Sequence, residues 1–207
     1  MNVEVQWKGL WDYEDFLKAQ EKRHDEMLKN ICGEVLWGCE HPSVITLGRR
    51  GSFQEDILEP QIQIPVLSVD RGGQATLHSP GQLMIYPMVN WSARKIGPQK
   101  VVQEIHRITE EIAAEYGHQV LKDSDQVGVY TDEGKLAFTG LRMDRGISRH
   151  GHSINVSNDL LLFQKIRSCG TRNASLVHLR THLSMEDLFQ KWSQKFSQWL
   201  QSTHSIT

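Results

Sequence analysis

The spacing of apolar residues predicts three amphipathic helices. In three segments, apolar side chains recur every three or four residues, which is the pattern of a helix with one buried face. Asp12 can cap the first helix, Pro98 suits the first turn of the second, and Gly117 can end it. The third carries aromatic residues at helical spacing, which we interpret as core anchors. The helices are expected over residues 13–28 and 98–116, and from Ser184 onward.

Shorter apolar runs predict strands between these helices. Runs of four to eight residues that are rich in Val, Ile and Leu and bounded by turn residues are typical of buried strands. The turn Asp132-Glu133-Gly134 suits a hairpin. Helices that interrupt sets of adjacent strands predict an α+β fold. The expected strands cover residues 34–40, 43–48, 65–69, 83–89, 127–131, 136–143 and 153–156.

The composition is typical of a globular domain. With 207 residues, 39% of them apolar and 23% charged, residues 1–207 are expected to form a single domain. No apolar stretch approaches the length of a membrane span, and the N-terminus lacks the basic start and apolar core of a secretion signal. We therefore expect a cytoplasmic protein without membrane contact.

Cysteine and histidine usage argues against disulfide and metal frameworks. Three cysteines, Cys32, Cys39 and Cys169, are an odd number without a scaffold pattern, which fits a reducing compartment. The ten histidines are scattered, and none forms a His-x-x-x-His or His-Glu-x-x-His pair, so no metal site is expected. The net charge of −2 and the absence of basic runs that alternate with aromatic residues argue against a nucleic-acid partner.

The segment Asp70–Gln82, with the sequence DRGGQATLHSPGQ, carries the most informative chemistry. It joins two predicted strands, so it lacks the helix N-terminus that phosphate-binding and dinucleotide-binding loops need beside their glycines. The paired glycines leave bare backbone, and Arg71, Thr76 and His78 can point at a ligand. The alternative is a wide hairpin whose glycines only satisfy turn geometry.

The order of residues in this segment resembles the ligand-binding loop of the lipoyl(octanoyl) transferases. These enzymes move an octanoyl group from acyl carrier protein to a lysine of a lipoyl domain. The resemblance runs from about Glu34 to Gly170 and implies the fold of the biotin and lipoate protein ligases, a mixed sheet flanked by helices. Its further motifs are Glu40–Gly48, Gly128-Val129-Tyr130, Lys135 with Gly140 five residues later, His150-Gly151, Asn155, Asp159-Leu160, Phe163, Ile166 and Cys169-Gly170.

The resemblance implies a catalytic pair, Cys169 and Lys135. Cys169 stands at the family's nucleophile position, although a lone cysteine is more often structural. The octanoyl group would pass from the phosphopantetheine thiol of the carrier to Cys169 and then to the target lysine, without ATP, metal or another cofactor. A reactive thiol needs its pKa lowered by a neighbouring cation, and the target amine, with a pKa near 10.4, must lose a proton. Lys135 is the candidate for both roles.

The resemblance also assigns the walls of the acyl pocket. This chain departs from the family at Phe138 and Thr139, where small or aliphatic residues are common, and at His152 and Ser153, where a Leu-Ala pair is usual. We expect these changes to alter the preference for chain length and not the reaction. The assigned residues are Arg71, Gly72, Gly73, Gln74, Ala75, Thr76, Leu77, His78, Phe138, Thr139, Gly140, Gly151, His152 and Ser153.

The implied partners are acyl carrier protein and, as acceptors, the lipoyl domains of 2-oxoacid dehydrogenases and the glycine cleavage H protein. We expect a monomer. Residues 140–180 hold seven basic and two acidic side chains, which predicts a docking face for acidic partners. A solvated surface is the alternative.

Four other functions compete with the transferase. An ATP-dependent lipoate-protein ligase shares the loop and the lysine but needs no nucleophile at position 169. An amidotransferase that moves acyl groups between lipoyl-type domains would also use a cysteine. A thiol hydrolase could be built on Cys169, His150 and Asn155, and a binding module would form no covalent adduct. The ordered set of motifs favours the transferase.

Overall fold

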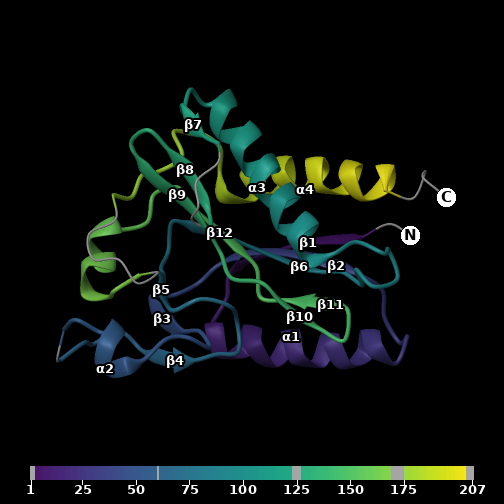
Figure 1. Ribbon diagram of the computed structural model, residues 1–207, viewed down its shortest axis with the longest axis horizontal. Helices are drawn as coiled ribbons and strands as arrows, with labels where there is room; N and C mark the ends of the chain where they lie inside the picture. The colour runs from purple at the N-terminus through teal and green to yellow at the C-terminus, as the bar shows by residue number, and fades with distance from the viewer. Residues whose placement is uncertain (1–2, 60, 123–126, 169–174, 204–207) are drawn as a thin grey trace.

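The computed structural model describes residues 3–59, 61–122, 127–168 and 175–203. A seven-stranded mixed sheet has the order β1-β2-β6-β12-β9-β8-β7, and a three-stranded sheet has the order β4-β3-β5 (Figure 1). The large sheet consists of β1 (Glu4–Leu10), β2 (Val35–Glu40), β6 (Gln82–Met88), β7 (Val120–Leu121), β8 (Val129–Thr131), β9 (Gly134–Thr139) and β12 (His152–Asn155). The small sheet consists of β3 (Val44–Leu47), β4 (Val66–Ser68) and β5 (Ala75–His78). A separate hairpin is formed by β10 (Arg142–Asp144) and β11 (Ile147–Arg149).

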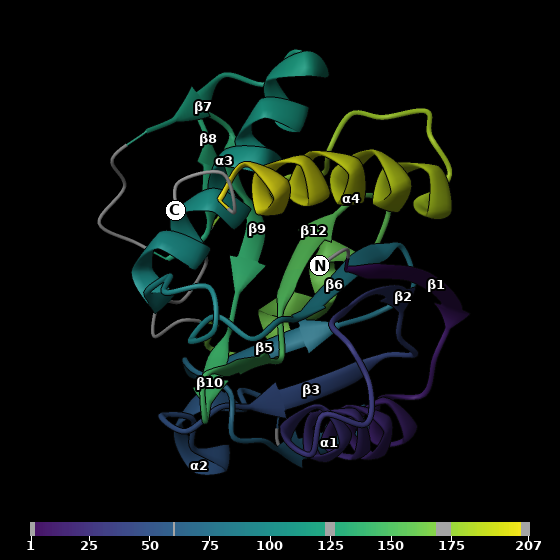
Figure 2. The same ribbon diagram turned by 90° about the vertical axis from the view of Figure 1, so that its right-hand side faces the viewer.

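The helices cover both sides of this arrangement. α3 and α4 lie over one face of the large sheet, and α1 lies on the opposite side, next to the small sheet (Figures 1 and 2). No helix among the described residues is long and apolar enough to cross a membrane. The helices are α1 (Tyr13–Leu28), α2 (Phe53–Asp56), α3 (Pro98–Glu115), α4 (Met185–Ser202) and the 3₁₀ helix η1 (Leu160–Lys165).

The central strands are buried on both faces. On β2, Leu36 enters the core between the sheet and α3 and α4, whereas Val35 and Trp37 enter the core beneath α1. Because successive side chains of a strand point to opposite faces, a continuous apolar run is what such a strand requires. Gly38 of β2 allows α4 to approach closely, because a Cβ atom there would lie 2.4 Å from the ring of Phe189.

The three helices predicted from periodicity are confirmed. The Asp12 carboxylate caps α1 by accepting the backbone N–H groups of Glu14 and Asp15 at 2.9 and 3.1 Å. α3 begins at Pro98, and Gly117, with a φ of +80°, follows its end. Local chemistry therefore sets these boundaries as expected.

Several strands differ from the prediction. β1 was not predicted; it pairs in parallel with β2, and its residues are half-buried or exposed. The expected strand over 136–143 ends at Thr139, and β10 begins at Arg142. The segment Asp70–Gln82 is not wholly a loop, because it contains β5, which pairs antiparallel with β3. Glycine and polar side chains obscured β5, whose polar residues are buried because they line a cavity.

Candidate active site

A cavity of about 490 Å³ lies between the glycine loop and strands β5, β6, β9 and β12. Its volume is typical of small-molecule sites. It is lined by Tyr13, Arg50, Arg71, Gly72, Gly73, Gln74, Ala75, Thr76, His78, Met84, Tyr86, Val102, Val127, Tyr130, Lys135, Phe138, Thr139, Gly140, Leu141, His150, Gly151, His152 and Ser153. The predicted pocket residues are therefore brought together, with one exception. Leu77 does not line the cavity: it lies between Thr76 and His78 on β5 and packs in the core with Ile45.

Arg71 holds the glycine loop in shape. We expected its guanidinium to face a ligand, but it donates hydrogen bonds to Thr46 O, Gly72 O and Gln74 O at 2.7 to 2.8 Å. A Cβ atom at Gly48 would lie 2.5 Å from Gly73 O, so the loop packs against bare backbone there. The loop is thus fixed by its own arginine, although Arg71 also contributes to the cavity wall.

Burial keeps His78 neutral at the cavity. Gln82 donates its amide N–H to Asn155 Oδ1 at 2.9 Å, so its Oε1 is free to accept the Nδ1–H of His78 at 2.8 Å. The His78 ring also stacks on Tyr13, with ring centres 5.8 Å apart. Burial lowers the pKa of His78 to about 3. His78 is therefore an uncharged part of the wall at neutral pH.

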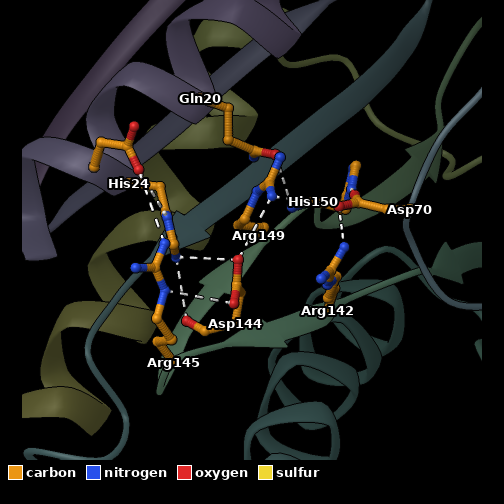
Figure 3. Close-up of polar contacts among 9 residues, drawn as sticks. Gln20, His24, Asp70, Arg142, Asp144, Arg145, Arg149 and His150 are labelled. Carbon is orange, nitrogen blue, oxygen red and sulfur yellow. Dashed lines mark hydrogen bonds and ion pairs between the residues drawn. The ribbon is translucent and has the colours of Figure 1, made fainter.

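A second histidine, His150, is held by Asp70 (Figure 3). His150 Nε2 lies 2.5 Å from the Asp70 carboxylate, and the backbone N–H of His150 donates to Gln20 Oε1 at 3.1 Å. The hydrogen bond from His150, helped by the charges of Arg149 and Arg142, holds the pKa of Asp70 well below its usual range. Burial lowers the pKa of His150 despite this carboxylate. Its φ of +56°, uncommon for a residue with a side chain, marks local strain.

Two adjacent residues of β12 face different surroundings. The Thr109 hydroxyl donates to Ile105 O, so His152 Nε2–H must donate to Thr109 Oγ1, at 2.9 Å. His152 Nδ1 then accepts from the Thr139 hydroxyl, also at 2.9 Å. His152 is thus tied to α3, and burial lowers its pKa well below the usual value. Ser153 is buried, and its hydroxyl has no hydrogen-bond partner among the described residues.

Lys135 is buried in the cavity wall with only 3% of its surface exposed. Its Nζ donates to Val127 O at 3.0 Å and lies 4.6 and 5.1 Å from the ring centres of Phe138 and Tyr130. Its backbone N–H donates to Ser175 O at 2.8 Å. Lys135 is therefore not the solvated hairpin residue that its place after a turn would otherwise suggest.

The predicted nucleophile, Cys169, lies outside the described residues. Its described flanks both pair with residues that line the cavity. On one side Ser168 forms a β-bridge with Ala75, and on the other Leu176 forms one with Lys135. The part of the chain that the structure describes contains no group of three or more His, Cys, Asp or Glu residues that could hold a metal ion.

The basic residues between 140 and 180 have carboxylate partners in most cases. The ion pairs are Arg142 and Arg149 with Asp70, Arg145 with Asp25 and Asp144, Lys165 with Glu59, and Arg180 with Glu133. Arg172 lies outside the described residues. The docking face stays a prediction, but these intramolecular pairs balance most of the charge on which it rested.

The sequence did not indicate nine of the wall residues as binding residues. Tyr13 reaches the cavity through the packing of α1 on the large sheet, whereas Tyr86 belongs to β6, one of the strands that form the wall. Their positions in the helical and strand patterns predicted two core residues, and both side chains are indeed buried. The signals in the sequence were at Tyr130 and His150, which belong to the motifs of the resemblance but were not assigned to the pocket.

Comparison with known proteins assigns the family. The family described as "Lipoyl protein ligase A/B catalytic domain" matches residues 12–198. The chain belongs to this family. It is 38% identical over 205 residues to the octanoyltransferase of Shewanella loihica, covering 98% of this chain and 93% of the relative. It is 37% identical over 207 residues to that of Shewanella amazonensis, covering 99% and 94%.

The fold is that of lipoate and biotin protein ligases. A crystal structure of lipoate-protein ligase A bound with ATP aligns with a TM-score of 0.74 at 13% identity, over 97% of this chain and 86% of the other. A bipartite lipoate protein ligase from Thermoplasma acidophilum aligns with a TM-score of 0.66 at 14% identity, over 97% and 84%. At this identity the structures show the fold alone. The octanoyltransferase relatives support an acyltransferase and do not favour the ATP-dependent ligase.

Proposed function

We propose that this protein transfers an octanoyl group from octanoyl-acyl carrier protein to the lysine of lipoyl domains, the first step of endogenous protein lipoylation. In this proposal Cys169 carries the acyl group as a thioester and Lys135 acts as the base. The observation that carries the proposal is the pairing of both flanks of Cys169 with the cavity wall, at Ala75 and at Lys135. The octanoyltransferase relatives support the same reaction.

The first step exchanges one thioester for another. The Cys169 thiolate attacks the octanoyl carbonyl carbon, and the carrier's phosphopantetheine thiolate leaves and takes up the proton that Cys169 lost. Lys135 would take the proton from Cys169, favour the thiolate in the resulting ammonium form, and pass the proton to the leaving thiolate, so that Lys135 is neutral for the second step. Backbone N–H groups of Gly72 and Gly73, which line the cavity, are candidates to stabilise the negative charge on the carbonyl oxygen.

The second step forms the amide. The lysine of the lipoyl domain attacks octanoyl-Cys169, its nitrogen loses a proton to Lys135, and the Cys169 thiolate leaves. Because an amide is more stable than a thioester, the proposal needs neither ATP nor a metal. Lys135 lines the cavity, which is the position that a base for this step requires.

The cavity suits an acyl chain. Phe138, Met84 and Leu141 supply apolar surface along the wall. Burying the seven carbons beyond the carbonyl at about 0.8 kcal/mol each would contribute about 6 kcal/mol to binding. Hydrophobic contact of this size allows the cavity to retain the acyl group between the two steps.

The test is the intact mass of the protein after incubation with octanoyl-carrier protein without ATP. We expect one added octanoyl group that hydroxylamine removes, its loss in Cys169→Ser, and its retention in the control Cys32→Ser. An adduct on Cys32 or Cys39 would overturn the assignment. Transfer that requires ATP and tolerates Cys169→Ala would identify a ligase, and free octanoate as the sole product would identify a hydrolase. A donor restricted to acylated lipoyl domains would identify the amidotransferase.

A further inference from the structure

Two exposed arginines lie beside the glycine loop, immediately after β3. The backbone N–H groups of Arg49 and Arg50 donate to Arg71 O and Gly73 O, each at 3.1 Å. This pairing fixes both residues to the loop that forms the cavity wall. Arg50 also lines the cavity, whereas Arg49 does not. The backbones of both residues are therefore held beside the cavity wall, and both residues are exposed to solvent.

These arginines differ from the other basic residues near the cavity in their charge balance. Arg142 and Arg149 share the Asp70 carboxylate (Figure 3). Neither Arg49 nor Arg50 forms an ion pair within the described ranges, from residue 3 to residue 203 with their gaps. Positive charge that is exposed and not balanced by a neighbouring carboxylate acts on an approaching anion with most of its strength.

A third arginine extends the same rim. Arg167 donates its backbone N–H to Asp56 O at 2.7 Å, and the next residue, Ser168, pairs with Ala75 of β5. Arg167 also has no ion pair among the described residues. The backbones of Arg49 and Arg50 thus meet the segment 71–75 directly, and Arg167 is joined to the same segment through its neighbour Ser168.

We propose that Arg49 and Arg50, with Arg167, form the docking surface for the acyl donor, an acidic carrier domain that presents its acyl group on a flexible arm. This rests on the proposed function, which needs such a donor to reach the cavity. Charge complementarity selects the partner, because exposed arginines at the mouth of a cavity attract acidic surfaces and raise the rate of association. The sequence predicted a docking face among the basic residues of 140–180, most of which are paired. The proposal places it instead beside the glycine loop.

The experiment compares Arg49→Glu with Arg145→Glu. Both side chains are exposed and both substitutions change the charge by two units, but Arg145 lies in the β10–β11 turn, near Asp25 and Asp144. For each, kcat/KM is measured at low and high salt with two donors, octanoyl-carrier protein and octanoyl-pantetheine, which carries neither protein nor phosphate. Arg49 rather than Arg50 is changed because it does not line the cavity.

We expect Arg49→Glu to lower kcat/KM for the carrier-protein donor at least fivefold at low salt, with the difference shrinking as salt rises. With octanoyl-pantetheine we expect less than a twofold change, and with Arg145→Glu less than twofold for either donor. An equal loss with both donors, or an equal loss in Arg145→Glu, would overturn the docking surface. A loss of the same size with octanoyl-4′-phosphopantetheine would overturn protein docking in favour of phosphate capture. Failure of the wild type to form acyl-Cys169 from any donor would instead refute the proposed function.

Discussion

Adjacent residues of β12, His152 and Ser153, are expected to respond to truncation with opposite signs. Their side chains leave the strand on opposite faces. His152 uses both ring nitrogens in hydrogen bonds to Thr139 and Thr109, whereas the Ser153 hydroxyl is buried without a partner among the described residues. His152→Leu therefore removes two hydrogen bonds, whereas Ser153→Ala removes a buried hydroxyl that forms none among the described residues.

The magnitudes follow from the partners that remain. After His152→Leu, the Thr139 hydroxyl keeps its contact with His106 Nε2 at 2.8 Å, and Thr109 keeps those with Ile105 O and Trp192 Nε1. Two hydrogen bonds at about 0.5–1.5 kcal/mol each are lost, so the free energy of unfolding should fall by about 1–3 kcal/mol. For a chain of this size that is a Tm lower by about 2–12 °C. Ser153→Ala should leave Tm unchanged or raise it by about 1–3 °C, because a buried unpaired hydroxyl is destabilising.

The assay combines thermal unfolding with donor selectivity. Tm is measured by circular dichroism, and kcat/KM is compared for C6, C8, C10 and C12 acyl donors. Ser153→Ala should raise kcat/KM for the longer chains, because removing a polar atom from the wall lets each added methylene gain nearer the full ~0.8 kcal/mol. His152→Leu should change stability more than selectivity. A fall in Tm for Ser153→Ala as large as that for His152→Leu would refute the assignment of the two faces.

Three other predictions address catalysis, packing and pH. Lys135→Ala should lower turnover by about 10²–10⁴-fold. Lys135→Arg should be inactive as well, because a guanidinium does not give up its proton near neutral pH. Near-normal turnover of the arginine variant would leave Lys135 only an electrostatic role. Gly38→Ala should lower the free energy of unfolding by about 1–3 kcal/mol in urea titrations, because the added Cβ atom would clash with the Phe189 ring. An unchanged urea midpoint would show that the ring can move. Burial lowers the pKa of His78 to about 3, so the unfolded chain binds its proton first as pH falls below about 6.5. Stability should therefore decline between about pH 6.5 and 3, by up to about 1.4 kcal/mol per pH unit, and His78→Gln should flatten this slope; identical slopes would contradict it.

Much of the fold follows from local signals. The caps at Asp12 and Ser184 and the proline at position 98 act within one turn of the helix that they begin, so the sequence alone locates these helices. β1 was missed because only Val5 and Trp7 face the core from an otherwise exposed edge, and their partner, β2, lies about 30 residues away in the sequence. Pairing at that distance leaves no local pattern.

The site divides in the same way. The glycine loop and the position of Lys135 were recognisable from the order of residues, but their physical roles were not. Arg71 was expected to face a ligand, and its hydrogen bonds to Thr46 form only once β3 lies beside the loop. Tyr13 joins the wall because α1 packs across β6. Such contacts depend on tertiary packing, which composition and periodicity do not encode.

The distribution of charge in the cavity explains why the proposed chemistry and the proposed docking fall to different residues. Burial lowers the pKa of His78 to about 3 and that of His106 to about 4, the latter with a contribution from the charge of Lys135, so both rings stay neutral at pH 7. The guanidinium of Arg71 is occupied by loop carbonyls. In the proposed reaction, proton transfer inside the cavity therefore falls to Lys135, whereas the proposed docking of an acidic partner falls to Arg49 outside it. Separating the two lets salt weaken the approach of the donor without altering the acyl-transfer step itself.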